Sequence, residues 1–327
     1  MTDIKLSHNK VGGGGMTALA AMLNSANYSL ANIELWHSSL NDEGIGVLTV
    51  AFARNNTLRR LNLGGNDKVT VAGWRAFFTQ LQSPHPSLEE LVLWGNTIDD
   101  DIVGLLANAL ISGTPLKALN LARSDSITTE GWEAFFAILH SPHCMLQDLN
   151  LHTNGFSDEE ISQLTNVLAN NCTMKSLDLN SNYQVTASGW RAFSSVLQNP
   201  NSALEIVNLQ YNTIDNDVVG NFAASLMHNK KLKELFFDEG GYDEEDEEVD
   251  AATVAGWDAL SNVLCNNSSI DATFHSNHTL QRIYNPGDSD DSDCEFELPT
   301  DLQTLLQMNR ENTPVESARR KILKVHF

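Results

Sequence analysis

The sequence has little cysteine, little positive charge and no long apolar run. Its four cysteines form no Cys-x-x-Cys pair, so it predicts neither a disulfide framework nor a zinc site. Twenty basic residues stand against 42 acidic ones, and the net charge of −22 argues against a nucleic-acid-binding protein, which should carry a basic patch. No stretch of about 18 apolar residues is present to span a membrane, and the N-terminus lacks the apolar segment of a secretory signal. We therefore expect a cytoplasmic protein, with a nuclear location left open, and no nucleic-acid or membrane partner.

The apolar residues, 42% of the chain, follow a repeat. The segments Leu58–Asn66, Leu88–Asn96 and Leu146–Asn154 all fit the pattern LxxLxLxxN, which is typical of leucine-rich repeats. The third apolar position of this pattern recurs every 28 to 30 residues, at Leu6, Leu35, Leu63, Leu93, Leu121, Leu151, Leu179, Leu209 and Phe237. The chain is therefore predicted to be a stack of about nine similar units.

Each unit is predicted to contain one strand and one helix. The x-L-x-L stretch alternates, which is typical of a short strand with its leucines on one face. After the asparagine the spacing becomes helical, because Trp74, Phe77, Phe78 and Leu81 stand at i, i+3, i+4 and i+7. No unit can bury its apolar face alone, so neighbouring units must stack to form a continuous core.

Successive units alternate in sequence, giving a period of 58 residues. One member of each pair carries Gly-Trp-x-Ala-Phe, and the other carries Thr-Ile-Asp-x-Asp, as at Thr97–Asp101 and Thr213–Asp217. The recurring tryptophans Trp74, Trp132, Trp190 and Trp257 are predicted to lie in the core. A column of asparagines is predicted to bind backbone groups of neighbouring units: Asn9, Asn66, Asn96, Asn154, Asn182 and Asn212.

These motifs resemble the ribonuclease-inhibitor type of leucine-rich repeat over residues 1–269. The resemblance implies an α/β solenoid, a horseshoe with a parallel β-sheet on its concave face and helices on its convex face. Ribonuclease inhibitor itself is cysteine-rich, so inhibition of ribonuclease is not implied for this chain. Residues 270–327 are predicted to form a capping segment with an acidic loop at 288–297, a helix capped by Thr300 and a basic final helix. Leu280–Tyr284 is a candidate for one last strand.

No catalytic motif accompanies the repeat. Gly12–Gly15 is not followed by Gly-Lys-Ser/Thr, so it is no phosphate-binding loop and is expected to be a flexible loop. GxSxG and HExxH are absent. We therefore predict a protein that is not an enzyme and that needs no cofactor or metal. The first strand also begins almost at Met1, which leaves two alternatives open: its edge is covered by a partner or a second copy, or further sequence precedes it.

The side chains that break the repeat are the candidate binding residues. Strand side chains alternate in direction, so the variable positions between the leucines are predicted to line the concave face. Exposed aromatic residues there are typical of interface anchors, although a tryptophan shielded by its neighbours is the alternative. The predicted partner-binding residues are Trp36, Arg60, Glu90, Trp94, Asp148, His152, Asp178, Tyr211 and Phe236.

An acidic insertion lies close to this predicted surface. The spacing from Trp190 to Trp257 is 67 residues, and the added residues fall in the loop 238–250. Such a run is either solvated or able to attract a basic partner. The predicted acidic rim comprises Asp243, Glu244, Glu245, Asp246, Glu247 and Glu248. The sequence thus favours a non-catalytic scaffold that binds a partner protein, possessing a basic patch, on its concave face and acidic rim.

An alternative function is stimulation of a GTPase. The family of Ran GTPase activators is built from similar repeats, commonly carries an acidic segment and places an arginine on a loop edge. In this sequence Arg123, directly after a repeat leucine and alanine, is the positional candidate. The acidic run here interrupts a repeat instead of forming a C-terminal tail.

Overall fold

The computed structural model describes residues 2–82, 87–237, 254–283 and 298–327. The chain divides into two compact units, residues 1–154 and residues 155–327. This division differs from the predicted boundary between residues 269 and 270, which stays a prediction.

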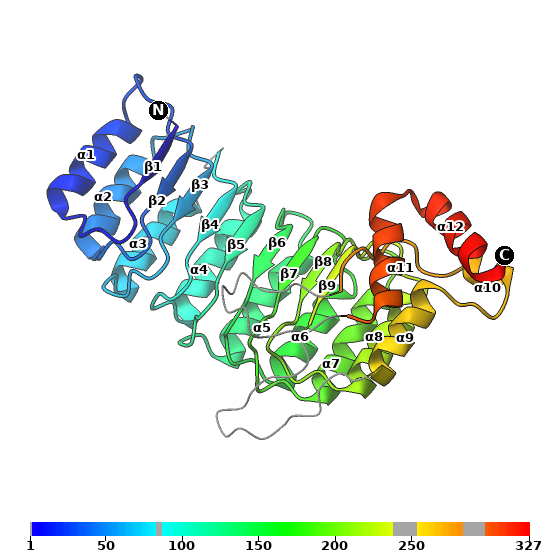
Figure 1. The fold of residues 1–327 in the computed structure, drawn as a ribbon. Helices are drawn as coiled ribbons and strands as arrows, with labels where there is room; N and C mark the ends of the chain where they lie inside the picture. The colour runs from blue at the N-terminus through cyan, green and yellow to red at the C-terminus, as the bar shows by residue number, and fades with distance from the viewer. Residues whose placement is uncertain (1, 83–86, 238–253, 284–297) are drawn as a thin grey trace. The chain divides into compact units, whose positions relative to one another are not determined.

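The first unit is a parallel sheet with helices on one side (Figure 1). Neighbouring strands pair in register, so that Ile4, Ile33 and Leu61 lie side by side. Its strands are β1 (Asp3–Lys5), β2 (Asn32–Glu34), β3 (Arg60–Asn62), β4 (Glu90–Val92), β5 (Ala118–Asn120) and β6 (Asp148–Asn150). Its helices are α1 (Gly13–Leu23), α2 (Asp42–Phe52), α3 (Val71–Leu81), α4 (Asp100–Ile111) and α5 (Thr129–Ala137), followed by the 3-10 turn η1 (Ile138–His140).

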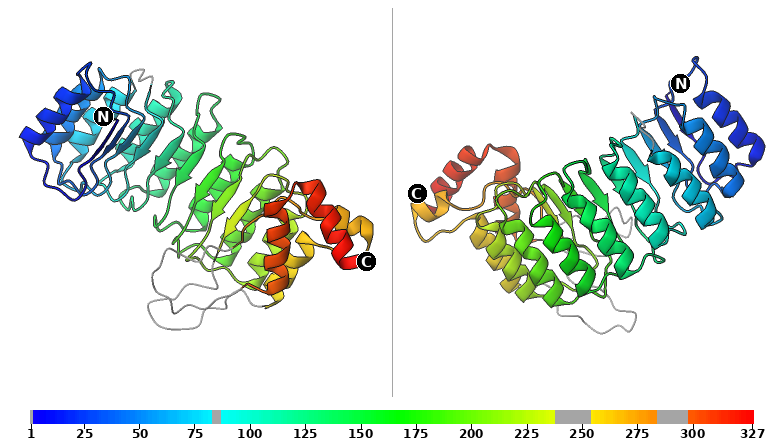
Figure 2. Two further views of the ribbon diagram at one scale, coloured as in Figure 1. Left: turned by 45° about the horizontal axis from the view of Figure 1, so that its top comes forward. Right: turned by 180° about the vertical axis from the view of Figure 1, so that it is seen from behind.

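The second unit repeats this arrangement and ends in three further helices (Figure 2). Helix α11 contacts α9 and α12, and α12 contacts α10. Its parallel strands are β7 (Ser176–Asp178), β8 (Ile206–Asn208) and β9 (Glu234–Phe236). Its helices are α6 (Asp158–Leu168), α7 (Ala187–Ser194), η2 (Ser195–Gln198), α8 (Asn216–Leu226), α9 (Val254–Leu264), α10 (Ile270–Phe274), α11 (Thr300–Glu311) and α12 (Pro314–His326).

The predicted core is confirmed. The repeat leucines Leu61 and Leu63 have no exposed surface, and neither has Trp74. Trp132 and Trp257, from the same sequence motif, are 2% and 3% exposed. The strand leucines and the helix aromatics thus pack between sheet and helices, as the two periodicities predict.

The asparagine column also performs its predicted role. Asn66 donates through Nδ2 to the carbonyls of Leu35 and Leu63, at 2.9 and 2.8 Å, and its Oδ1 accepts from the backbone N–H groups of Ser38 and Leu40. One buried side chain therefore satisfies backbone groups of two neighbouring repeats. Asn9 differs, because it is exposed and donates only to carbonyls of its own repeat.

The alternation of repeats has a structural cause at the helix N-termini. In the first turn of α4, the carboxylate of Asp100 accepts from both the backbone N–H and the hydroxyl of Thr128, each at 2.7 Å. Thr128 precedes α5 of the next repeat, so an acidic residue of one repeat stabilises the helix start of the next. A Cβ at Gly131 would overlap the Asp100 carboxylate, which explains why this motif begins with glycine. The same pairing joins Asp42 to Thr70 and Asp158 to Thr186.

Three local predictions need correction. Gly13 begins α1, so this glycine-rich stretch forms the first helical turn and not a loop. Thr300 is the first residue of α11, and the capping position is Pro299. The expected last strand is a single bridge between Glu234 and Arg282, although Leu280 and Ile283 are fully buried.

Candidate partner-binding surface

Four aromatic rings of the first unit gather where strands β1, β2 and β4 end. We call His8, Trp36, His37 and Trp94 the aromatic patch. The ring centroids of His8 and Trp36 lie 4.1 Å apart in an edge-on arrangement, and those of His37 and Trp94 lie 5.0 Å apart. Trp36 and Trp94 are 6.3 Å apart. Both tryptophans are half-buried, whereas both histidines are exposed. The patch is therefore a continuous aromatic surface that faces solvent.

Two glycines make room for this patch. A Cβ at Gly64 would overlap the indole of Trp94, and a Cβ at Gly65 would overlap the imidazole of His37. The His37 ring is held there because Nδ1 lies 3.1 Å from the carbonyl oxygen of Gly65. Any side chain at these two positions would displace the rings.

The patch residues occupy a turn that every described repeat contains. The chain turns after each strand through a residue with positive φ, and His8 and His37 take this conformation at 58° and 49°. The other members of this column are Gly65, Gly95, Arg123, Thr153, Ser181 and Tyr211. His8 and His37 were not predicted as binding residues. The sequence could have indicated them, because His8 and His37 occupy the repeat position at which Gly65 and Gly95 stand in the next repeats.

Two strand residues beside the patch are almost fully buried. Asn62 and Val92 point to the solvent-facing side of the sheet, yet they are only 8% and 7% exposed. The equivalent residues Glu34 and Asn120 are partly buried. Asn62 also accepts the backbone N–H of Gly64 at 3.1 Å, which fixes the turn beneath Trp94.

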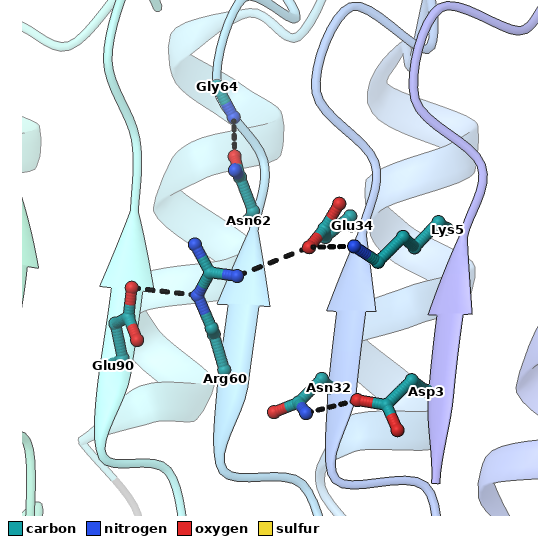
Figure 3. Close-up of polar contacts among 8 residues, drawn as sticks. All are labelled: Asp3, Lys5, Asn32, Glu34, Arg60, Asn62, Gly64 and Glu90. Carbon is teal, nitrogen blue, oxygen red and sulfur yellow. Dashed lines mark hydrogen bonds and ion pairs between the residues drawn. The ribbon is translucent and has the colours of Figure 1, made fainter. Parts of the chain in front are cut away.

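A row of ion pairs crosses β1 to β4 next to the patch (Figure 3). Arg60 lies between two carboxylates, 3.2 Å from Glu34 and 2.8 Å from Glu90, and Lys5 lies 3.6 Å from Glu34. Each such pair contributes at most about 1 kcal/mol at a surface. The predicted binding residues Arg60 and Glu90 are thus engaged with each other, and their charges cancel locally.

The remaining predicted residues of the first unit are separate from the patch. Asp148 is exposed on β6. The His152 backbone N–H donates to Asn150 Oδ1 at 3.0 Å, and its ring Nδ1 lies 2.8 Å from the Thr153 hydroxyl.

In the second unit, Asp178 accepts the backbone N–H of Asn180 at 3.0 Å, so it forms a turn as Asn62 does in β3. Tyr211 is 48% exposed and Phe236 is half-buried. The whole predicted acidic rim, Asp243 to Glu248, lies outside the described residues, as does the acidic segment 288–297.

Arg123, the candidate for GTPase stimulation, is exposed with a φ of 53°. Its backbone N–H donates to the carbonyl of His152 at 3.0 Å. The repeat turn therefore accounts for its unusual conformation, and nothing in the described part of the chain favours a catalytic role for it.

Metal and thiol chemistry find no support among the described residues. Their His, Cys, Asp and Glu side chains form no group of three or more able to hold a metal ion. Cys144, Cys172 and Cys265 are free thiols, and burial raises the pKa of Cys144 and of Cys265. Within the described ranges no helix is both long and apolar enough to cross a bilayer.

Comparison with known proteins supports the repeat assignment. A family model described as Leucine Rich repeat matches residues 1–20, 54–78 and 170–194. NACHT, LRR and PYD domains-containing protein 14 of Mus musculus is 26% identical over 232 residues, which covers 71% of this chain and 23% of that protein. Ribonuclease inhibitor of Mus musculus is 27% identical over 182 residues, covering 56% of this chain and 40% of the inhibitor. The chain thus spans less than half the length of these relatives.

A solved structure shows the same fold. The leucine-rich repeat-containing protein LegL7 from Legionella pneumophila aligns with a TM-score of 0.54 at 16% identity, covering 86% of this chain and 89% of that one. Together with the parallel strand–helix repeats and the asparagine column, these likenesses identify the architecture. The chain therefore has the fold of a leucine-rich-repeat protein, and its repeats are similar in sequence to those of ribonuclease inhibitor.

Proposed function

We propose that this protein is a non-catalytic scaffold that binds a partner protein through the aromatic patch of its first unit. The observation that carries the proposal is the half-buried pair Trp36 and Trp94, which lie 6.3 Å apart and are flanked by exposed imidazoles. Tryptophan supplies much of the binding energy at protein interfaces, because a large rigid ring leaves water at low conformational cost.

Three further features support binding at this place. Gly64 and Gly65 leave space for the rings, so the patch is set before any partner arrives. The Lys5–Glu34–Arg60–Glu90 row neutralises the neighbouring charges, which lowers the cost of bringing a partner against them. The half-buried Trp36 ring also lies edge-on to the exposed His8 ring, with the centroids 4.1 Å apart, and we infer that this arrangement suits a side chain of a partner protein.

The acidic segment 238–250 enters the proposal as a second element. It carries nine carboxylates and no basic residue. Such a segment accelerates the approach of a basic partner and makes association depend on salt. We propose that it steers the partner, whereas the aromatic patch holds it.

The test is a comparison of matched variants against native extract, followed by purified partner. Trp36→Ala/Trp94→Ala is expected to lose a partner that wild type retains. Tyr28→Ala/Tyr183→Ala is the control, because these tyrosines are 41% and 58% exposed and belong neither to the aromatic patch nor to the predicted binding residues. Deletion of residues 238–250 is expected to slow association at low salt and to leave the dissociation rate unchanged.

Each part of the proposal has its own contrary result. Equal partner binding by wild type and the double tryptophan variant would remove the aromatic patch as the site. An association rate that is insensitive to salt and to the deletion would remove the steering role of the acidic segment. Circular dichroism of each variant confirms that its fold is kept.

A further inference from the structure

The C-terminal end of the second unit contains a cavity of about 170 Å³. Its lining comes from the loop after α8, from the last residue of α10 and the loop after it, and from the start of α12. We call it the cap pocket. Three large apolar side chains of its lining are unusually exposed: Met227 at 50%, Phe274 at 54% and Val315 at 60%. Pro314 and Ala318 add further apolar surface.

Two polar side chains of the lining, Asn277 and His278, are already engaged with the protein. Asn277 donates to the carbonyls of Leu226 and Asn229 and accepts two backbone N–H groups. His278 has Nε2 at 3.2 Å from the Phe274 carbonyl and Nδ1 at 3.2 Å from the Lys321 ammonium. A ligand therefore gains little from hydrogen bonds with these side chains, and the pocket selects for apolar contact.

Among the described residues, two exposed cations lie in the lining of the cap pocket or on the helix that lines it, and one carboxylate, Asp271, lies 3.4 Å from Nδ1 of the lining residue His275. Lys230 lies in the lining and forms no ion pair with any described residue. Arg319 is exposed one helical turn after Val315, so both residues lie on one face of α12. The nearest carboxylate on that helix, Glu316, is held by the backbone N–H and hydroxyl of Thr313.

We propose that the cap pocket binds one large apolar side chain of an acidic peptide segment in a partner protein. A cavity of about 150 Å³ accommodates benzene, so this volume suits a single leucine or phenylalanine side chain. Carboxylates on either side of that anchor residue would then meet Lys230 and Arg319. This site is separate from the aromatic patch, and neither proposal depends on the other.

A short fluorescein-labelled peptide with one leucine between aspartates and glutamates tests the proposal by fluorescence anisotropy. Wild type is expected to bind it about 10-fold or more tightly than the same peptide with alanine for leucine. Val315→Glu is expected to weaken binding of the leucine peptide at least about 10-fold, because it places a charge in the pocket and repels the peptide. Lys230→Glu is expected to weaken binding as well.

Matched controls separate the pocket from general surface effects. Leu323→Glu changes an exposed apolar residue of the same helix, 63% exposed and outside the lining, and should bind as wild type does. Lys175→Glu reverses an exposed charge elsewhere in the second unit. The proposal is overturned if wild type does not bind, if both peptides bind equally, or if Val315→Glu and Leu323→Glu lose the same affinity. A further variant replaces the acidic residues at 288–297 by neutral ones. The proposal is also overturned if the peptide binds only to this variant, because the chain's own acidic segment would then occupy the pocket in wild type.

Discussion

The tryptophans of the first unit fall into two groups that differ in their burial and in whether they recur with the repeat. Trp74 and Trp132 recur with the repeat and are 0% and 2% exposed between sheet and helices. Trp36 and Trp94 interrupt the repeat and lie half-buried on the other side of the strands. The first group is required by packing, whereas the neighbouring repeats fold without a counterpart of the second. Residues that repeat in register therefore report on the fold, and residues that break it report on the surface.

The largest expected difference between these groups is in stability. Trp74→Ala removes a fully buried ring and is expected to lower the free energy of unfolding by about 3–5 kcal/mol. Trp94→Ala, half-buried, is expected to cost about 1 kcal/mol or less. Urea unfolding of both variants measures the difference. Equal losses of stability would mean that Trp94 belongs to the core, which would contradict the division of the tryptophans into two groups.

The buried ring of His278 is expected to make the stability of the protein depend on pH. Burial, together with the charge of Lys321, lowers the pKa of His278 to about 4. Its ordinary value is 6.5, so the folded protein favours the neutral ring. The stability from this group is complete above pH 6.5 and falls as the pH drops towards 4, by about 3 kcal/mol in all.

Urea unfolding at several pH values between 7 and 4 measures this loss. His278→Asn is expected to reduce the dependence on pH in that range, whereas Leu323→Asn, which changes an exposed side chain with no titratable group, should leave it as in wild type. If wild type and His278→Asn lose the same stability on acidification, His278 is not the group responsible.

The repeated part of the chain could be predicted well from the sequence, because each repeat can be compared with the others at the same position. Leu63, Trp74 and Asn66 stand where the register placed them, and their burial and hydrogen bonds agree. The capping role of Asp100 was missed, since its hydrogen bonds reach a residue 28 positions away and no local pattern indicates them.

The candidate site was less predictable. Trp36 and Trp94 were identified because they break the register, but the contacts of His8 and His37 with them depend on how the turns of separate repeats align. Arg60 looked like a binding residue, and only the structure shows that it pairs with Glu34 and Glu90. Charged side chains on a sheet interact across strands, and their partners cannot be read from one strand alone.

Replacing a glycine that recurs with the repeat is expected to cost more stability than replacing one that does not recur. Gly131→Ala is expected to lower the free energy of unfolding by about 1–3 kcal/mol, because the added methyl group would overlap the Asp100 carboxylate. Gly104→Ala is the control: Gly104 lies within α4 and a Cβ there meets no atom within 4 Å. This change is expected to be neutral or stabilising by up to about 1 kcal/mol. Thermal unfolding of the two variants distinguishes them, and a harmless Gly131→Ala would contradict the packing explanation.

The smallest expected effect concerns the acidic residues at the start of α6. Asp158 accepts from Thr186 at two atoms, 2.8 and 2.7 Å away, whereas its neighbour Glu159 is exposed. Asp158→Asn and Glu159→Gln each remove one negative charge from the same helical turn, so their effects on the helix dipole should be similar. The additional loss in Asp158→Asn, about 0.5–1 kcal/mol, then measures what the charge and the second acceptor oxygen of Asp158 contribute to the hydrogen bonds with Thr186. An amide already stands at the matching first position of α8, where Asn216 Oδ1 accepts the Gly256 N–H at 3.1 Å, so the loss should stay this small. Identical unfolding curves for the two variants would show that neither the charge nor the second acceptor oxygen of Asp158 adds to the stability at this position.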